Sequence, residues 1–345
     1  MTTVKGFRKG ANLGGWLSQG PLVKEHLDTF ITEKDIARIA SWGLDHIRLP
    51  IDYDNFENED GTDILEGYRH IDDCIAWCKK YNLNMVLDLH KTQGYIFDDF
   101  EYSKNFFDDE RLQARFYGIW HKLMKKYAEY SDMLMVELLN EVVRDDVVDK
   151  WNDIASKCID IIRSYSSDIK ILVGGVSYNA VSSVELLPDF DDRNIVYNFH
   201  CYEPQLFTHQ SAYWVENMPL DFHIGYPADW DEVCRLTYDM NITPAILCIE
   251  ESQKMDITSL TPAFFEKIFA PAVKIAKERG KCLYCGEYGV IDQAVPEDAV
   301  RWFKDIHFVF EKYGIGRSVW NYKGKDFGLV DEHYDDVRDE LIKYL

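Results

Sequence analysis

Long apolar runs are missing from this sequence of 345 residues. No stretch approaches the roughly 18 consecutive apolar residues that a membrane-spanning helix needs, so we expect no segment that crosses a bilayer. Residues 1–7 also lack the apolar core and the small-residue cleavage site of a secretory signal. We therefore expect a cytoplasmic protein, or a secreted one if a leader has been removed.

Basic residues are scarce relative to acidic ones. The chain has 38 Lys and Arg against 60 Asp and Glu, which gives a formal net charge of -22. This charge repels nucleic-acid phosphates and anionic lipid headgroups, so we expect neither nucleic acid nor a membrane as partner. A neutral sugar feels no such repulsion, and 49 aromatic residues (9 Trp, 21 Tyr and 19 Phe) supply flat apolar faces on which it can stack.

Cysteines are too few for a disulfide-stabilised scaffold, with 8 in 345 residues. Cys282 and Cys285 have a C-x-x-C spacing, but alternation along a strand would point them to opposite faces. The sequence has no H-E-x-x-H motif either. We therefore expect reduced thiols, no bound metal and no cofactor.

Strand-like and helix-like segments alternate along the chain, which is typical of an α/β fold with parallel strands. Eight segments read as strands, at residues 9–13, 46–49, 84–89, 133–139, 170–173, 194–199, 282–286 and 316–320. Helical patterns follow at 33–42, 68–81, 110–130, 149–165, 182–187 (a weaker one), 263–279, 296–313 and 335–344. This order predicts a single (β/α)8 TIM barrel over residues 1–345.

The spacing between the sixth and seventh strands is unusually long. About 80 residues separate them, and only the last part reads as a crossover helix. Loops that follow barrel strands open on the catalytic face. We therefore expect residues 203–260 to form a small helical subdomain that makes one wall of a cleft.

Polar residues gather where the predicted strands end, which is where a barrel carries its active site. The strand ends contain Arg48, His90, Asn140 with Glu141, His200 with Tyr202, Glu287 and Trp320. Since side chains alternate along a strand, adjacent Asn140 and Glu141 can both face inward only if the backbone bends between them.

Two of these carboxylates suggest a specific chemistry. Glu141 and Glu287 follow strands four and seven, which face each other across the mouth of an eight-stranded barrel. Retaining glycoside hydrolysis uses such a pair, with one carboxyl as acid and the other as nucleophile. Glu141 would be the acid, its pKa raised by burial or nearby charge, and Glu287 would stay ionised beside Arg48 and the Tyr202 hydroxyl.

The remaining mouth residues would bind the sugar. Asn140 would hydrogen-bond the 2-hydroxyl group next to the cleaved bond, and Trp320 would form the stacking floor. His90 and His200 are expected to contact substrate or nucleophile, although a buried His can also be a satisfied core residue. Trp16 and Trp214 are further candidates for stacking, with a role in the core of the inserted subdomain as the alternative for Trp214. Arg48 could instead neutralise a buried carboxylate such as Glu137, and both roles can hold together.

The motifs together resemble glycoside hydrolase family 5, the cellulase family. They are Asn12-Leu13-Gly14-Gly15-Trp16, Arg48-Leu49-Pro50, His90, Asn140-Glu141, His200-Cys201-Tyr202, Gly286-Glu287-Tyr288-Gly289 and Trp320. The chain is most similar to a clostridial-type single-domain endoglucanase. This resemblance implies Glu141 as acid/base and Glu287 as nucleophile, and it implies a helical insertion after strand six. Lys91 departs from the His-His pair of that branch, which puts the sugar contact expected there in question.

We therefore predict a retaining endo-β-1,4-glucanase that acts as a monomer on β-glucan oligosaccharides or polysaccharides without a cofactor. The substrate class comes from the resemblance, whereas the two-carboxylate chemistry comes from the residues. A mixed-linkage β-1,3-1,4-glucanase or a β-mannanase on the same site is the alternative, because the catalytic pair does not distinguish neighbouring sugars. A catalytically silent carbohydrate-binding barrel is the alternative from another class.

Overall fold

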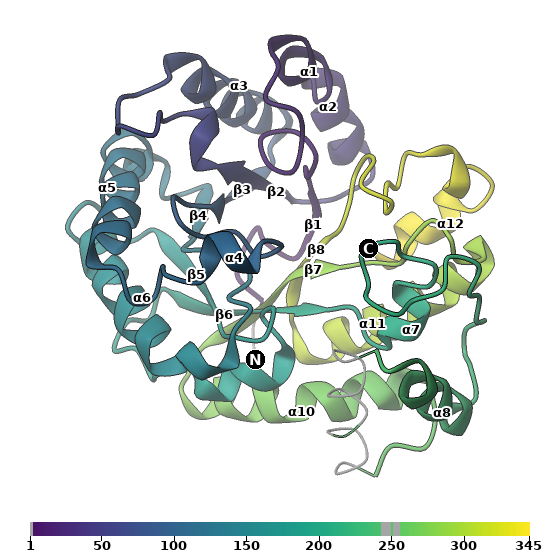
Figure 1. Cartoon of the computed structure of the whole chain (residues 1–345). Helices are drawn as coiled ribbons and strands as arrows, with labels where there is room; N and C mark the ends of the chain where they lie inside the picture. The colour runs from purple at the N-terminus through teal and green to yellow at the C-terminus, as the bar shows by residue number, and fades with distance from the viewer. Residues whose placement is uncertain (1–2, 243–249, 251–255) are drawn as a thin grey trace.

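Eight parallel strands close into a barrel in chain order, and β1 pairs with both β2 and β8 (Figure 1). The computed structural model describes residues 3–242, 250 and 256–345. The strands are β1 (Lys9–Asn12), β2 (His46–Asp52), β3 (Asn84–Lys91), β4 (Leu134–Glu137), β5 (Lys170–Gly174), β6 (Ile195–Cys201), β7 (Cys282–Tyr288) and β8 (Gly316–Val319). The prediction of a (β/α)8 barrel is confirmed.

Helices surround the barrel on its outer side (Figure 1). They are α1 (Lys24–Thr29), α2 (Glu33–Ser41), α3 (Leu65–Tyr81), α4 (Phe100–Ser103), α5 (Glu110–Tyr127), α6 (Val148–Arg163), α7 (Gln205–Thr208), α8 (Trp230–Met240), α10 (Pro262–Glu278), α11 (Pro296–Tyr313) and α12 (Arg338–Leu341). The long helices α3, α5, α6, α10 and α11 each bury an apolar face in the core, whereas α1 buries no residue. In the described part of the chain, no helix is long and apolar enough to cross a membrane.

Helix ends follow local chemistry that is visible in the sequence. The Asp35 carboxylate accepts the backbone N–H of Thr32 at 2.8 Å, which caps the start of α2. Gly314 ends α11 with φ of 67°, a left-handed conformation that glycine adopts without a steric cost.

The crossover between β5 and β6 differs from the other six. The weak helical pattern at residues 182–187 becomes a 3₁₀ helix over Val181–Leu186 rather than an α-helix. At the C-terminus, the helix predicted over 335–344 is reduced to α12 and a following 3₁₀ turn, Ile342–Tyr344. Both segments are short, and tertiary packing decides the form of such weakly periodic pieces.

The barrel interior is layered along the strands. An apolar floor contains Val86, Met135, Leu172, Val196 and Tyr284, which come from five successive strands. Because every second residue faces inward, the next layer contains the residues two positions later, namely Asp88, Glu137, Gly174, Asn198 and Gly286. The interior therefore changes from apolar at the floor to polar toward the mouth.

The insertion between β6 and α10 contains two described helices, α7 and α8. Part of the predicted 203–260 segment, residues 243–249 and 251–255, lies outside the described residues. Cys248 belongs to that part, and the cysteines within the described ranges form no disulfide.

Candidate active site

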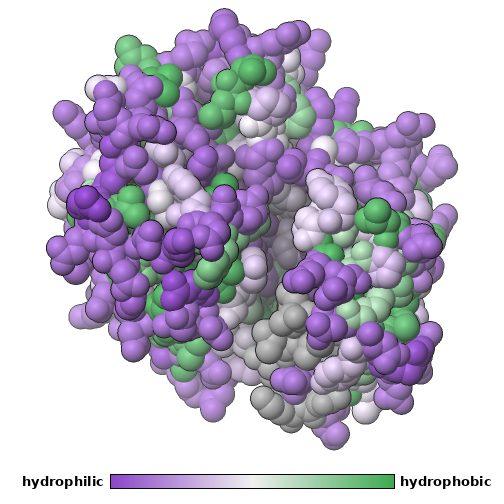
Figure 2. All heavy atoms as spheres, in the orientation of Figure 1, coloured by the Kyte–Doolittle hydropathy of each residue, from purple (hydrophilic) through white to green (hydrophobic). Residues whose placement is uncertain are grey.

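The polar strand ends meet over the middle of the barrel. Figure 2 shows a groove across this face of the molecule, with hydrophilic side chains on both sides. Hydrogen bonds link Arg48, Asn140, Glu287 and Tyr202 beneath it, and the hydrogen-bonded pair of Glu141 and His200 lies 3.8 Å from Glu287.

The guanidinium of Arg48 is the centre of this network. It is fully buried and contacts three carboxylates. Its nitrogens lie 2.7 and 3.0 Å from the two oxygens of Glu137, 2.7 Å from Glu287 Oε1 and 3.0 Å from Asp88 Oδ2. Both roles considered for Arg48 are therefore present, because it binds the deeper Glu137 and the mouth residue Glu287 together.

Two amides complete the contacts of Arg48. Its Nη1 donates to Asn12 Oδ1 at 2.9 Å and its Nη2 donates to Asn140 Oδ1 at 2.9 Å. Asn12 Nδ2 then donates to the backbone carbonyls of Gly286 at 2.9 Å and Ser318 at 3.0 Å. Asn12 thus links the guanidinium to β7 and β8, a contact that the sequence did not reveal.

The backbone bends at Glu141, as predicted from its position next to Asn140. The last ladder bond before the bend runs from Asn140 N to Leu89 O at 3.0 Å, and Glu141 then takes φ of 23°. This turn brings its Oε1 to 2.7 Å from His200 Nδ1. Burial, followed by the charge of Arg48, lowers the pKa of His200 well below its usual value, so the ring is neutral.

Glu287 has different partners from Glu141. Its Oε1 accepts from Arg48, and its Oε2 accepts from the Tyr202 hydroxyl at 2.9 Å. His200 Nδ1 lies 3.8 Å from the same Oε2. One carboxylate oxygen of Glu141 lies within 4.8 Å of one oxygen of Glu287, so both carboxyl groups can reach one glycosidic bond.

The two carboxyl groups titrate differently because of these partners. Burial, and then the negative charge of Glu287, raises the pKa of Glu141 well above its usual value. Burial also raises the pKa of Glu287, but Arg48 and the Tyr202 hydroxyl oppose that rise. When the pair holds one proton, the proton therefore resides on Glu141.

His90 and Trp320 form a stacked pair at the mouth. Their rings are 6.0 Å apart with an interplanar angle of 10°, and His90 Nδ1 lies 2.6 Å from Asp88 Oδ2. A Cβ atom at Gly14 would lie 2.4 Å from the Trp320 ring. Glycine is therefore required at that position, because any larger side chain would displace the indole.

Trp16 does not take the role predicted for it. Its ring has no exposed surface, stacks 6.2 Å from the Trp77 ring of α3 and donates from Nε1 to Leu27 O at 2.7 Å. The ring is fully covered by the α1 and α3 side of the barrel. Trp16 is thus a core residue and cannot stack on a sugar.

An aromatic ridge extends from the nucleophile candidate Glu287 toward the insertion. We define it by Tyr202, Phe327, Trp214 and Tyr213, whose successive ring centroids lie 5.9, 6.4 and 4.7 Å apart. Trp214 is 44% exposed and Tyr213 is 75% exposed. The ridge therefore presents aromatic surface to solvent at its outer end, as a stacking role for Trp214 requires.

A family model described as cellulase (glycosyl hydrolase family 5) matches residues 10–326. The chain belongs to glycosyl hydrolase family 5. This membership confirms the resemblance found from the motifs, and it identifies the chain as a glycoside hydrolase.

Curated relatives and solved structures agree with this family. Cellodextrinase A of Ruminococcus flavefaciens is 42% identical over 92% of this chain and 86% of that protein. Endoglucanase C of Acetivibrio thermocellus is 41% identical over 98% of both chains. Cel5A of Thermotoga maritima, solved with mannotriose, has a TM-score of 0.76 at 22% identity and covers 98% of this chain and 97% of its own. This structural likeness shows the shared fold.

Lys91 makes its own local pairing in this family member. Its Nζ lies 2.6 Å from Asp54 Oδ2 and 5.8 Å from the Tyr53 ring centroid. The position that departs from the His-His pair of the clostridial branch is therefore occupied by an ion pair on the rim, next to His90.

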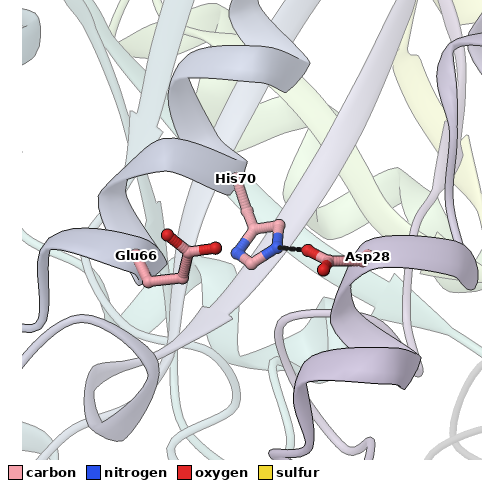
Figure 3. A group of neighbouring side chains, drawn as sticks. All are labelled: Asp28, Glu66 and His70. Atoms are coloured by element: carbon pink, nitrogen blue, oxygen red, sulfur yellow. Dashed lines mark hydrogen bonds and ion pairs between the residues drawn. The ribbon is translucent and has the colours of Figure 1, made fainter.

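Three side chains outside the mouth of the barrel are arranged like the ligands of a metal ion. Asp28, Glu66 and His70 each offer a ligand atom within 4.8 Å of the others, and Figure 3 shows His70 between the two carboxylates. Arg69 Nη2 lies 2.6 Å from Asp28, 2.7 Å from Glu66 and 3.1 Å from His70 Nε2. The guanidinium occupies the point that all three atoms face, so the group is a network of ion pairs within the chain.

Replacing Arg48 by Met should lower the free energy of unfolding by about 3–5 kcal/mol, because three buried carboxylates lose their cation. The loss should grow from about pH 5 to 8, since those carboxyl groups can protonate in the folded state only at the lower pH. Chemical denaturation at several pH values measures this dependence.

Arg317→Met is the matched control, because Arg317 is also fully buried but its partner Glu311 keeps 27% of its side-chain surface exposed. Arg317 also contacts His307, whose pKa is lowered by burial to about 4. The variants are therefore compared between pH 7 and 8, where that ring is neutral and the destabilisation by Arg317→Met should vary much less with pH. Equal pH dependence in both variants would contradict the central role of Arg48.

Proposed function

We propose that the protein is a retaining endo-β-1,4-glucanase in which Glu141 is the acid/base and Glu287 is the nucleophile. The observation that carries this proposal is the separation of the two carboxyl groups, which have oxygens within 4.8 Å of each other. Retaining enzymes hold them about 5–5.5 Å apart, whereas inverting enzymes leave about 6.5–9.5 Å for a water molecule.

The partners of the two carboxyl groups support these roles. In the first step, Glu141 donates its proton to the glycosidic oxygen while a Glu287 oxygen attacks the anomeric carbon, so that the bond to the leaving sugar breaks. In the second step, Glu141 takes a proton from water, whose oxygen displaces Glu287 from the same carbon. Arg48 and Tyr202 hold Glu287 ionised and oriented, and His200 holds Glu141.

The other mouth residues are proposed to bind the reacting sugar. Trp320 supports the face of the ring, while His90 and Asn140 offer polar groups to its hydroxyl groups. Asn140 is fixed by Arg48, so its amide can strengthen a hydrogen bond to the 2-hydroxyl as charge develops.

We propose that the described part of residues 203–260, which includes α7 and α8, forms one wall of the cleft and that Trp214 in the aromatic ridge stacks on a sugar beyond the cleaved bond. Glucan chains are the proposed substrate because relatives at 41 and 42% identity are named endoglucanase C and cellodextrinase A. A β-mannanase or mixed-linkage glucanase would use the same catalytic pair. A catalytically silent carbohydrate-binding barrel would instead lack one of the two carboxyl groups.

Proton NMR during the hydrolysis of cellotetraose tests the mechanism. The first product should carry the β configuration, because two displacements at one carbon restore its stereochemistry. An initial α anomer would refute the retaining assignment. Relative rates on carboxymethylcellulose, barley glucan and galactomannan separate the three substrate classes.

Glu287→Gln should lower kcat by at least about a thousandfold and leave cellotetraose binding nearly unchanged, because the amide cannot attack the anomeric carbon. Single-turnover assays and calorimetric binding measure the two effects. A variant that keeps substantial activity, or that folds but no longer binds sugar, would contradict the nucleophile role.

Trp214→Ala should raise KM for cellohexaose about tenfold and change KM for cellobiosides with a small leaving group by less than about twofold. The reason is that stacking on one aromatic ring contributes about 1–2 kcal/mol only where a sugar reaches it. Steady-state kinetics on both substrates measure the difference. Tyr238→Ala on α8, which removes a similarly exposed ring (43%) from the same insertion, is the control and should change neither value.

A further inference from the structure

The peptide backbone at Glu141 lies in an unfavourable conformation. Its φ of 23° is in the left-handed half of conformational space, where a side chain crowds the following carbonyl group. The β4 strand ends at Glu137, and the ladder bond from Asn140 to Leu89 is the last before the bend. Sheet hydrogen bonds therefore do not hold the peptide that carries the acid/base candidate.

A tyrosine hydroxyl bridges the two consecutive peptides that follow this bend. The hydroxyl of Tyr95 donates to the carbonyl oxygen of Glu141 at 2.8 Å and accepts the backbone N–H of Val143 at 2.9 Å. Tyr95 is 2% exposed, and the rings of Phe106 and Phe107 each lie 5.4 Å from its own. The hydroxyl is therefore fixed by packing rather than held on a mobile side chain.

A second turn supports the same segment from the β5 side. Ser177, Tyr178 and Asn179 have φ values of 55°, 60° and 54°, which is three successive left-handed residues. The N–H of Tyr178 donates to Val142 O at 3.1 Å, and Asn179 O accepts the N–H of His200 at 2.8 Å. One strained turn thus ties Val142, the residue after Glu141, to His200, the residue that binds the Glu141 carboxyl group.

We propose that Tyr95 is a positioning residue that acts through the Glu141 peptide and sets where the acid/base carboxyl group points. This inference rests on the proposed function, because it assumes that Glu141 delivers the proton. Glu141 must lie within hydrogen-bond reach of the glycosidic oxygen to protonate it. Rotation about the N–Cα bond of Glu141 would move its whole side chain. Among the described backbone contacts, only the Tyr95 bridge and the 177–179 turn oppose that rotation.

The leaving group of the substrate gives a direct test. A dinitrophenyl leaving group departs without a proton, whereas the sugar leaving group of cellotetraose needs one. Since kcat/KM reports steps up to the first irreversible one, Tyr95→Phe should lower kcat/KM for cellotetraose by about 10–100-fold. It should lower kcat/KM for dinitrophenyl β-cellobioside by less than about threefold, since no proton transfer is needed there.

The matched control is Tyr197→Phe. The Tyr197 hydroxyl also donates to a backbone carbonyl, the part-buried one of Pro188 at 2.8 Å, and accepts from Arg279 at 3.2 Å. It lies on the outer side of β6, so its loss should cost stability without changing the ratio of the two kcat/KM values. Circular dichroism and thermal unfolding verify that both variants are folded.

Glu141→Ala separates the positioning inference from the proposed function. This variant should show the largest difference between the two substrates. If Glu141→Ala shows no difference, the acid/base assignment itself is wrong. The other outcome concerns Tyr95 alone. If Glu141→Ala distinguishes the two substrates but folded Tyr95→Phe lowers kcat/KM equally for both, or for neither, Tyr95 has only a structural role and the inference is overturned.

A second variant keeps the test decisive if Tyr95→Phe does not fold. Asn179→Ala makes the left-handed turn less favourable, because alanine tolerates positive φ less well than asparagine. It should change the two kcat/KM values in the same direction as Tyr95→Phe by a smaller factor. An equal loss on both substrates would again overturn the inference.

Discussion

One buried cation organises the interior of this barrel. Arg48 on β2 bonds to residues on β1, β3, β4 and β7, so a single guanidinium ties together five of the eight strands at one level. A buried carboxylate is costly unless it is paired, and here one positive charge serves three of them. Burial accordingly raises the pKa of Asp88 and of Glu137 to about 7, even beside Arg48.

The mouth combines a regular scaffold with irregular backbone. Regular alternation fixes the height of Arg48, the strand register shifts beside His90 and His200, and Glu141 reaches its place only because the chain leaves the β4 ladder. Two elements outside the ladder, Tyr95 and the 177–179 turn, then bond to the backbone where it leaves β4. The carboxyl group of Glu141 is thus held directly by His200 and indirectly by contacts to the backbone at and after Glu141.

Much of this arrangement could be predicted from the sequence, because strand alternation and the position of strand ends are local signals. The barrel, the bend at Glu141 and the convergence of Arg48 with Glu287 all follow from those signals. The orientation of Trp16 could not be predicted. The glycines before it allow its side chain to point toward the cleft or toward the helices, and packing against Trp77 determines which.

The contacts of Asn12 and Tyr95 could not be predicted for a different reason. Both side chains bond to backbone groups that lie far away in the sequence, such as Gly286 for Asn12 and Glu141 for Tyr95. Such bonds leave no periodicity and no residue pattern. The filling of the Asp28, Glu66 and His70 group by Arg69 is likewise visible only in three dimensions.

The order of the strands has a consequence for how this protein is made. Because β8 closes the ring against β1, and Trp320 follows directly after β8, Trp320 leaves the ribosome only after all eight strands of the barrel. The side-chain amide of Asn12 can donate its hydrogen bonds to the carbonyls of Gly286 and Ser318 only after those residues have been synthesised. A chain whose synthesis has not passed β8 and Trp320 therefore cannot yet assemble the candidate active site.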